Sequence, residues 1–109
     1  MGVAATGEDW AMVLEHVVLD VRADSARDFE AAFAVAKPII TGAPGFCSLR
    51  LSRCIEQADR YVLLVEWVSV EAHEQGFRRS PAYQEWRRLL HHFYPAPPLV
   101  EHYETVFEG

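Results

Sequence analysis

The stretch EWVSVEAHEQGFRRSPAYQEW, Glu66 to Trp86, indicates how this chain folds. It starts as the end of an apolar strand, is interrupted at Gly76, and restarts as a helix at Ser80 and Pro81. Serine is a preferred N-cap residue and proline fits the first helical position, so this pair predicts a helix start. Because aromatic and basic side chains recur along it, the stretch predicts a helical cover over either a core or a pocket.

Strands are predicted on both sides of this stretch. Residues 12–22 and 60–68 are largely apolar on both faces, which is typical of strands that are covered twice. Residues 46–54 alternate Cys47, Leu49 and Leu51 with polar side chains, and a short polar loop joins them to 60–68 as a hairpin. The last strand is expected over residues 99–107, after the helix-ending YPAPP at 94–98.

Helices are predicted over residues 24–41, 69–75 and from 80 onward. Ser25 and Ser69 are expected as N-caps, and Asp28 suits the positive end of the first helix. Pro38 is expected to kink or end that helix, and Gly76 to interrupt the second. The first helix has an apolar stripe of Phe29, Phe33, Ala36 and Ile40, and the last has one of Ala82, Tyr83, Trp86, Leu89, Leu90 and Phe93.

The order strand, helix, strand, strand, helix, strand predicts an α+β, ferredoxin-like βαββαβ fold with a four-stranded antiparallel sheet. We expect one domain over residues 1–109, with a core at about 12–107 and a flexible segment at 1–11. Helices cover only one face of such a sheet, yet the strands are apolar on both faces. We therefore expect a homodimer in which two sheets pack back to back.

Charge and hydropathy argue against several functional classes. The formal net charge is −6, which disfavours binding to a phosphate backbone, so no nucleic-acid partner is expected. The longest apolar run, residues 61–65, is far shorter than the ~20 residues of a membrane-spanning helix. No secretory signal pattern precedes the fold, so we expect a cytoplasmic protein with Cys47 and Cys54 as free thiols.

Three motifs together are similar to the antibiotic biosynthesis monooxygenase family. They are PGF at 44–46, LLVEWVSVEA at 63–72 and FRRSPAYQEWRRLLHHFY at 77–94, and the resemblance covers about residues 13–107. It implies a dimeric α/β barrel with a pocket between sheet and helices in each subunit. Members of that family oxidise quinol- or anthrone-type aromatics with O2 and without metal or flavin, so no cofactor is expected.

The resemblance implies a cofactor-independent monooxygenase, an oxidoreductase acting on a small aromatic. One alternative is a non-catalytic ligand-binding or stress-associated dimer. A second is a haem-binding or haem-degrading relative, which is disfavoured because that branch resembles an Asn, Trp and His constellation and this chain contains no Asn. The family often has a His just before the Ser-Pro pair, where this chain has Gln75, Gly76 and Phe77, with His73 earlier.

Oxygenation without a cofactor requires a base, an apolar cavity and a group that stabilises an anion. Trp67 and His73 are the predicted catalytic residues, and His16 and His102 are further candidates for the base. The predicted substrate-binding residues are Phe77, Tyr83, Trp86, His16 and Arg50. Structural roles are open for the same residues, with Trp67, Tyr83 and Trp86 as core and His73 facing water. His16 and His102 would meet if the first and last strands pair, but two imidazoles do not make a zinc site, so no metal is expected.

Overall fold

The computed structural model describes residues 12–109 and is built on a four-stranded antiparallel sheet. The strands are β1 (Val13–Asp20), β2 (Phe46–Arg53), β3 (Arg60–Trp67) and β4 (Val100–Tyr103), in the spatial order β2-β3-β1-β4. β1 pairs with β3 and β4, and β2 pairs with β3. This α+β, ferredoxin-like arrangement confirms the predicted fold class. The predicted flexible segment at 1–11 lies outside the described residues.

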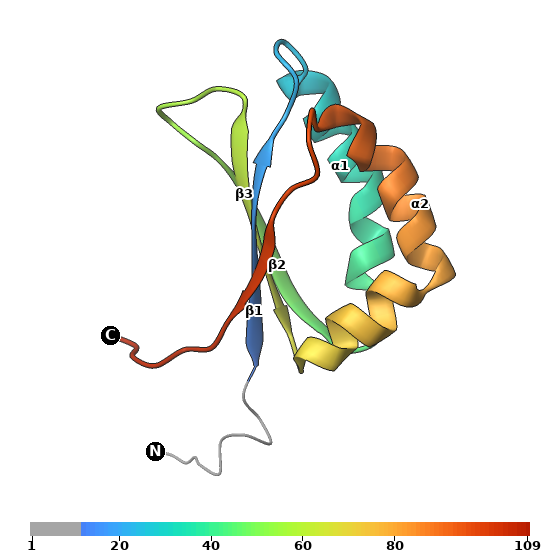
Figure 1. The fold of residues 1–109 in the computed structure, drawn as a ribbon, viewed down its shortest axis with the longest axis vertical. Coiled ribbons are helices and arrows are strands. Elements are labelled where there is room, and N and C mark those ends of the chain that lie inside the picture. Colours follow the sequence, from blue (N-terminus) through green and yellow to red (C-terminus); the bar gives the residue numbers. More distant parts are fainter. Residues whose placement is uncertain (1–11) are drawn as a thin grey trace.

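Helices cover one face of the sheet, as Figure 1 shows. They are α1 (Ala26–Thr41) and α2 (Pro81–Leu90), which lie side by side. A π-helical turn, η2 (Ala72–Gly76), and a 3-10 turn, η3 (Phe77–Arg79), lead from β3 into α2, and η4 (His91–Phe93) follows α2. A cavity lies under these helices.

The three predicted N-cap serines all stand at helix starts. Ser80 Oγ accepts a hydrogen bond from the Tyr83 amide at 3.2 Å, and Ser69 Oγ accepts one from the Ala72 amide at 3.0 Å. Ser25 is the N-cap residue of α1, as predicted, but its side chain makes no capping hydrogen bond. α1 also continues through Pro38 to Thr41, and helical turns continue past Gly76.

The core lies between the helices and the inner face of the sheet. The predicted stripe of α1 is fully buried, and from α2 the buried residues are Trp86 and Leu90. Ala82, which was placed on the same stripe, is exposed. The inner face of the sheet contributes Val17, Leu19, Tyr61, Leu63, Val65 and Trp67.

Two predicted strand details are corrected. β4 ends at Tyr103 rather than Phe107, because Tyr103 already pairs with Leu14 near the start of β1. The residues after Glu104 therefore have no strand beside them among the described residues. A bulge between Phe46 and Ser48 leaves Cys47 exposed, whereas alternation had placed it with Leu49 and Leu51.

No described element covers the outer face of the sheet, where an apolar patch lies among polar side chains such as His16, Arg50 and Glu66. Val18 is 39% exposed, while Leu14, Val62 and Leu64 are half-buried on the same face. Both cysteines are free thiols, as expected. Among residues 12–109, no helix has the length and apolar character that crossing a membrane requires.

Candidate functional site

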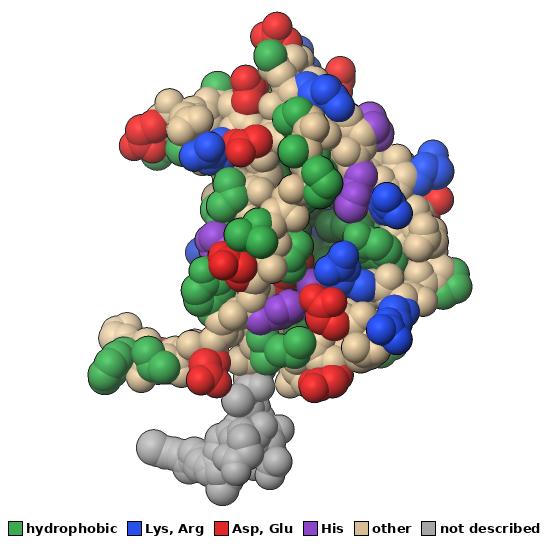
Figure 2. Space-filling view, viewed as in Figure 1, with side chains coloured by type: hydrophobic (Ala, Val, Ile, Leu, Met, Phe, Trp, Pro, Cys, Tyr) green, Lys and Arg blue, Asp and Glu red, His purple; other side chains and the backbone are tan. Residues whose placement is uncertain are grey.

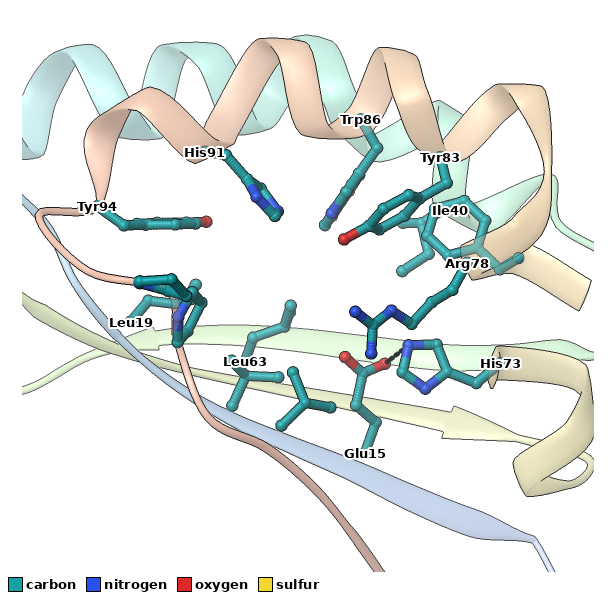
Figure 3. A pocket seen from close by; sticks show the side chains of 15 residues that line it. Glu15, Leu19, Ile40, Leu63, His73, Arg78, Tyr83, Trp86, His91 and Tyr94 are labelled. Carbon is teal, nitrogen blue, oxygen red and sulfur yellow. Dashed lines mark ion pairs between the residues drawn. The ribbon is translucent and has the colours of Figure 1, made fainter. Parts of the chain in front are cut away.

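A cavity of about 130 Å³ lies between the helices and the inner face of the sheet. Figure 3 shows β1 and β3 forming its floor, α2 its roof, and the segment after α2 one of its sides. Its lining is mainly apolar and aromatic, with a few polar groups at one end. The lining residues are Glu15, Val17, Leu19, Ile40, Leu63, His73, Phe77, Arg78, Tyr83, Trp86, His91, Tyr94, Pro97, Pro98 and Val100.

A second, outer chamber of about 430 Å³ adjoins this inner cavity. The two share Arg78, Tyr83, His91, Tyr94 and the Pro97–Pro98 pair, so the outer chamber is the mouth of the inner one. Figure 2 shows the hollow with Arg and His side chains around its rim and hydrophobic side chains behind. A ligand would therefore pass a basic rim before it reaches an apolar interior.

Glu15 is the buried carboxylate of the inner cavity. Alternation along β1 places it on the inner face beside Val17, and it is only 5% exposed. The Trp67 indole donates its Nε1–H to Glu15 Oε1 at 2.9 Å. Burial raises the pKa of Glu15 to about 7, although the Trp67 hydrogen bond and the nearby Arg78 charge favour the ionised form. This carboxyl group therefore changes protonation state near neutral pH.

His73 lies beside Glu15 at the end of the cavity. Its ring stacks on Trp67, with centroids 5.1 Å apart, and its Nε2 lies 3.4 Å from Glu15 Oε1. Burial lowers the pKa of His73 to about 4, and His102 and Arg78 contribute to the same direction. Between pH 4 and pH 7 both groups are consequently neutral. The geometry resembles an ion pair, but burial keeps the two charges from coexisting in that range.

His102 connects this pair to the protein surface. β4 pairs with β1 so that His102 lies opposite Glu15, and its Nε2 is 2.8 Å from His73 Nδ1. The His102 side chain is 18% exposed. A contiguous series of polar groups thus runs from the cavity through Glu15 and His73 to the half-buried His102. His16 does not take part, because it lies opposite Glu101 on the other face of the sheet.

Three of these side chains have ligand atoms close enough for one metal ion. His73, Glu74 and His102 bring theirs within 4.8 Å of one another. The two imidazole nitrogens, however, lie at hydrogen-bonding distance, and Arg78 Nη1 lies 3.5 Å from the Glu74 carboxylate. The arrangement in this structure is that of a hydrogen-bonded histidine pair, with the Glu74 carboxylate 3.9 Å from His73, 3.8 Å from His102 and paired with Arg78.

The π-helical turn η2 brings His73, Phe77 and Arg78 to the cavity. The Phe77 amide points to the carbonyls of both Ala72 and His73, which is the wide turn that defines η2. Such turns are rare and frequently occur at functional sites. Gly45, with φ +84°, allows β2 to begin close against η2, since a Cβ there would lie 2.6 Å from the Ala72 Cβ.

The structure brings together four of the seven predicted site residues. His73, Phe77, Tyr83 and Trp86 line the inner cavity. Trp67 is completely buried behind it and acts on the cavity through Glu15 and His73. His16 and Arg50 lie on the outer face of the sheet, so their predicted placement in this pocket is not what the structure shows. His16 instead packs edge-on against Tyr103.

Sequence reasoning missed Glu15, Arg78, His91 and Tyr94 as lining residues. Glu15 had a readable signal, since it is the one charged residue on a strand face otherwise formed by Val13, Val17, Leu19 and Val21. An isolated carboxylate on an apolar face is costly to bury and therefore marks a site candidate. Arg78 and His91 gave no such signal, because each lies in a run of neighbouring basic residues.

Comparison with known families agrees with this geometry. The family model for antibiotic biosynthesis monooxygenase matches residues 12–89, which are most of the chain. The chain therefore belongs to the antibiotic biosynthesis monooxygenase family, as its motifs predicted. The uncharacterized protein YczJ of Bacillus subtilis (strain 168) is 46% identical over 95 residues, covering 87% of this chain and 100% of YczJ.

Solved structures show the same fold. A Bordetella bronchiseptica protein assigned to the antibiotic biosynthesis monooxygenases superposes with a TM-score of 0.85 at 37% identity, over 89% of this chain and 99% of that one. SnoaB, a cofactor-independent oxygenase from Streptomyces nogalater, superposes with a TM-score of 0.71 at 19% identity, over 91% and 95%. The SnoaB likeness concerns the fold alone.

Proposed function

We propose that this protein is a cofactor-independent monooxygenase that oxidises a small aromatic quinol with O2 in the inner cavity. The observation that carries the proposal is Glu15, a buried carboxylate with a pKa near neutrality that faces an aromatic-lined cavity. A base whose pKa lies near the working pH is the most effective for general acid–base catalysis. Membership of the antibiotic biosynthesis monooxygenase family supports the same reaction class.

In the proposed reaction, Glu15 removes the proton from a phenolic hydroxyl. The resulting electron-rich anion passes one electron to O2, giving a semiquinone radical and superoxide. These combine through a new carbon–oxygen bond to a peroxide, and the O–O bond then breaks with loss of a ring proton and release of water. For hydroquinone the balance is hydroquinone plus O2 giving hydroxybenzoquinone plus water, so the substrate supplies every electron.

His73 and Trp67 support the base in this proposal. Trp67 fixes the Glu15 carboxylate through its indole N–H. His73 contacts Glu15 with Nε2 and His102 with Nδ1, so a proton can pass from Glu15 to the surface by reversing the donor and acceptor roles along the series. Glu15 therefore replaces His73 as the proposed base, because a pKa of about 4 makes His73 a poor proton acceptor at neutral pH.

The size of the inner cavity favours a monocyclic substrate over an anthrone. Its volume is about 130 Å³. An engineered protein cavity of about 150 Å³ binds one benzene molecule. A single ring therefore fits within the inner cavity, whereas the three fused rings of an anthrone would extend into the outer chamber. The same argument disfavours the haem alternative, because a porphyrin is larger still.

The test is O2 uptake by the wild-type protein with a panel of hydroquinones and anthrones. We expect turnover of hydroquinones alone, and a loss of at least ~100-fold in kcat for Glu15→Gln, since removal of a general base typically costs that much. Glu85→Gln, an exposed change of the same kind on α2, is the matched control and should retain full activity. The wild-type rate should rise as pH increases through about 7, because the ionised carboxylate is the base.

The second candidate is a binding protein that holds the same aromatic without oxidising it. The buried, preformed cavity supports binding by itself. Saturable binding of hydroquinones together with no O2 uptake across the panel would refute the monooxygenase and favour this candidate.

We further infer a homodimer that forms through the outer face of the sheet. Apolar side chains on that face are open to solvent in a single chain, and the segment after β4 contains Val106 and Phe107, which are 78% and 92% exposed. Figure 1 shows this segment extending away from the helices, on the side of the uncovered face. A second copy would cover both features, and it would place His16 and Arg50 at the interface.

A further inference from the structure

The outer chamber carries positive charge without a carboxylate in its wall. Arg78 and Arg87 both line it, together with His91, and no Asp or Glu is among its lining residues. The whole chain has a net charge of −6, so a local excess of basic groups is not a reflection of overall composition. The positive charge is concentrated where a ligand would enter.

The two arginines are in different electrostatic situations. Arg78 is half-exposed, lies 3.5 Å from the Glu74 carboxylate, and has its guanidinium 5.8 Å from the centre of the Tyr83 ring. Arg87 has no ion-pair partner within residues 12–109. Burial lowers the pKa of His91, and the charges of Arg87 and Arg78 lower it further. The imidazole of His91 is thus a neutral hydrogen-bonding group within the field of both arginines.

The basic groups of the outer chamber lie next to the inner cavity, where the aromatic ring is proposed to bind. Arg78 and His91 line both the inner cavity and the outer chamber. Figure 3 shows Arg78 extending toward Glu15 from one end of the cavity and His91 descending from the start of η4, directly after α2. A ring in the inner cavity would therefore have one edge directed at Glu15 and a substituent directed toward the basic mouth.

We propose that the aromatic ligand carries a carboxylate, which binds in the outer chamber between Arg78 and Arg87. Guanidinium groups recognise carboxylates with two parallel hydrogen bonds, and such charge-assisted bonds are the strongest that side chains form. His91 donates a further hydrogen bond from its neutral ring. The inference rests on the proposed function for the location of the ring, but it concerns binding and does not require turnover.

The experiment measures binding under nitrogen, so that no oxidation occurs. The probes are benzoate, 4-hydroxybenzoate, 2,5-dihydroxybenzoate and 3,4-dihydroxybenzoate, each compared with its neutral amide by isothermal titration calorimetry. At least one acid should bind the wild type 10-fold or more tightly than its amide. The preference should shrink severalfold in 0.5 M NaCl, because salt screens charges at a solvent-open mouth.

Substitutions of Arg78 and Arg87 test whether these two residues produce the preference for acids. Arg87→Gln and Arg78→Gln should each reduce the preference for acid over amide at least 5-fold. In Arg87→Gln the affinity for the amide should stay within 2-fold, because Arg87 lines only the outer chamber. Arg79→Gln is the matched control, because Arg79 is an exposed neighbour of Arg78 that lines neither chamber. It removes the same charge and should leave the preference intact.

Three outcomes would overturn the inference: equal affinity for every acid and its amide, a preference that Arg79→Gln reduces as much as Arg87→Gln, or no binding of any acid at 5 mM. These outcomes are separate from failure of the proposed function. A chain that prefers the acids in calorimetry but consumes no O2 in air supports the carboxylate site and refutes the oxygenase. A chain that oxidises hydroquinone without preferring acids supports the oxygenase and refutes the carboxylate site.

Discussion

Glu15 and His73 couple folding to pH in opposite directions. The pKa of Glu15 is raised from 4.5 to about 7 on folding, so its contribution to stability is fully present below pH 4.5 and is lost as pH rises to 7. The pKa of His73 is lowered from 6.5 to about 4, so its contribution is fully present above pH 6.5 and is lost as pH falls to 4. Between pH 4.5 and 6.5 the two slopes oppose each other.

We predict that single substitutions reveal the two opposing pH dependences of the free energy of unfolding, which offset each other in the wild type. Glu15→Gln should leave the His73 slope, so that the free energy of unfolding rises by about 2 kcal/mol from pH 4.5 to 6.5 relative to the wild type. In His73→Gln only the Glu15 slope remains, so the free energy of unfolding should fall by a similar amount over the same pH range, relative to the wild type. Urea denaturation at a series of pH values measures both. If the free energy of unfolding of both variants followed the same pH dependence as the wild type, burial would not shift the pKa values of Glu15 and His73.

At the scale of single residues, the sequence predicted His73 as a site residue but not its burial or its low pKa. An imidazole near the strand end was recognisable, and its burial and low pKa were not, because they depend on η2, Trp67 and β4 together. Glu15 was missed because the strand was interpreted as apolar on both faces, which drew attention away from the single acid on one of them. Arg50 and His16 were predicted by residue type, and strand register placed them on the other face.

At the scale of elements, capping differs between the two long helices. Ser80 caps α2 with its side chain, whereas Ser25 precedes α1 without a side-chain bond. We predict that Ser80→Ala lowers the free energy of unfolding by about 1 kcal/mol, the usual cost of losing a cap. Ser25→Ala, the matched control, should change it by less than about 0.5 kcal/mol. Thermal or urea unfolding of both variants measures this, and equal effects would contradict the assignment.

Gly45 controls the packing of η2 against the sheet. A side chain there meets a left-handed backbone, with φ +84°, and would place Cβ 2.6 Å from the Ala72 Cβ and 3.0 Å from Val68 Cγ2. Gly45→Ala should therefore cost at least about 2 kcal/mol of stability. Because η2 carries His73, quinol oxidation should fall as well.

Gly42→Ala is the control for that change. A Cβ at Gly42 would lie 3.3 Å from the Pro38 carbonyl oxygen, and the backbone there has φ −87°, which any residue adopts. We expect a small effect on stability and none on activity. Equal losses for Gly42→Ala and Gly45→Ala in urea denaturation would contradict the close approach at Gly45.

Element order was predictable because it follows from local signals. Periodicity gave the strands and helices, and serine with proline gave the start of α2. Element ends were less predictable where they depend on neighbours. β4 stops at Tyr103, opposite the second residue of β1, and α1 continues through Pro38 since only the last turn lies beyond it. The π-helical turn had no signal that distinguished it from an interrupted helix.

At the scale of the whole molecule, the uncovered sheet face predicts self-association. Wild-type protein in light scattering should have twice the 12.4 kDa mass of one chain. Leu64→Asp, on the outer face, should convert it to a 12.4 kDa species, because a charge there opposes burial against a second sheet. Val35→Asp is the control, since Val35 is 64% exposed on α1 and lies away from that face. A wild-type monomer at working concentration would refute the dimer.

The wide turn at η2 also has a meaning for how relatives of this chain diverge. A turn closed by the i to i+5 bond contains one residue more than an ordinary helical turn, so it equals a single-residue insertion that the fold has absorbed. A homologue one residue shorter between Trp67 and Ser80 would close this stretch as an ordinary helical turn, which keeps α2 in place but changes which side chains of the turn reach the cavity. The length of this one connection can therefore tune ligand choice among homologues while the strands and both long helices stay the same.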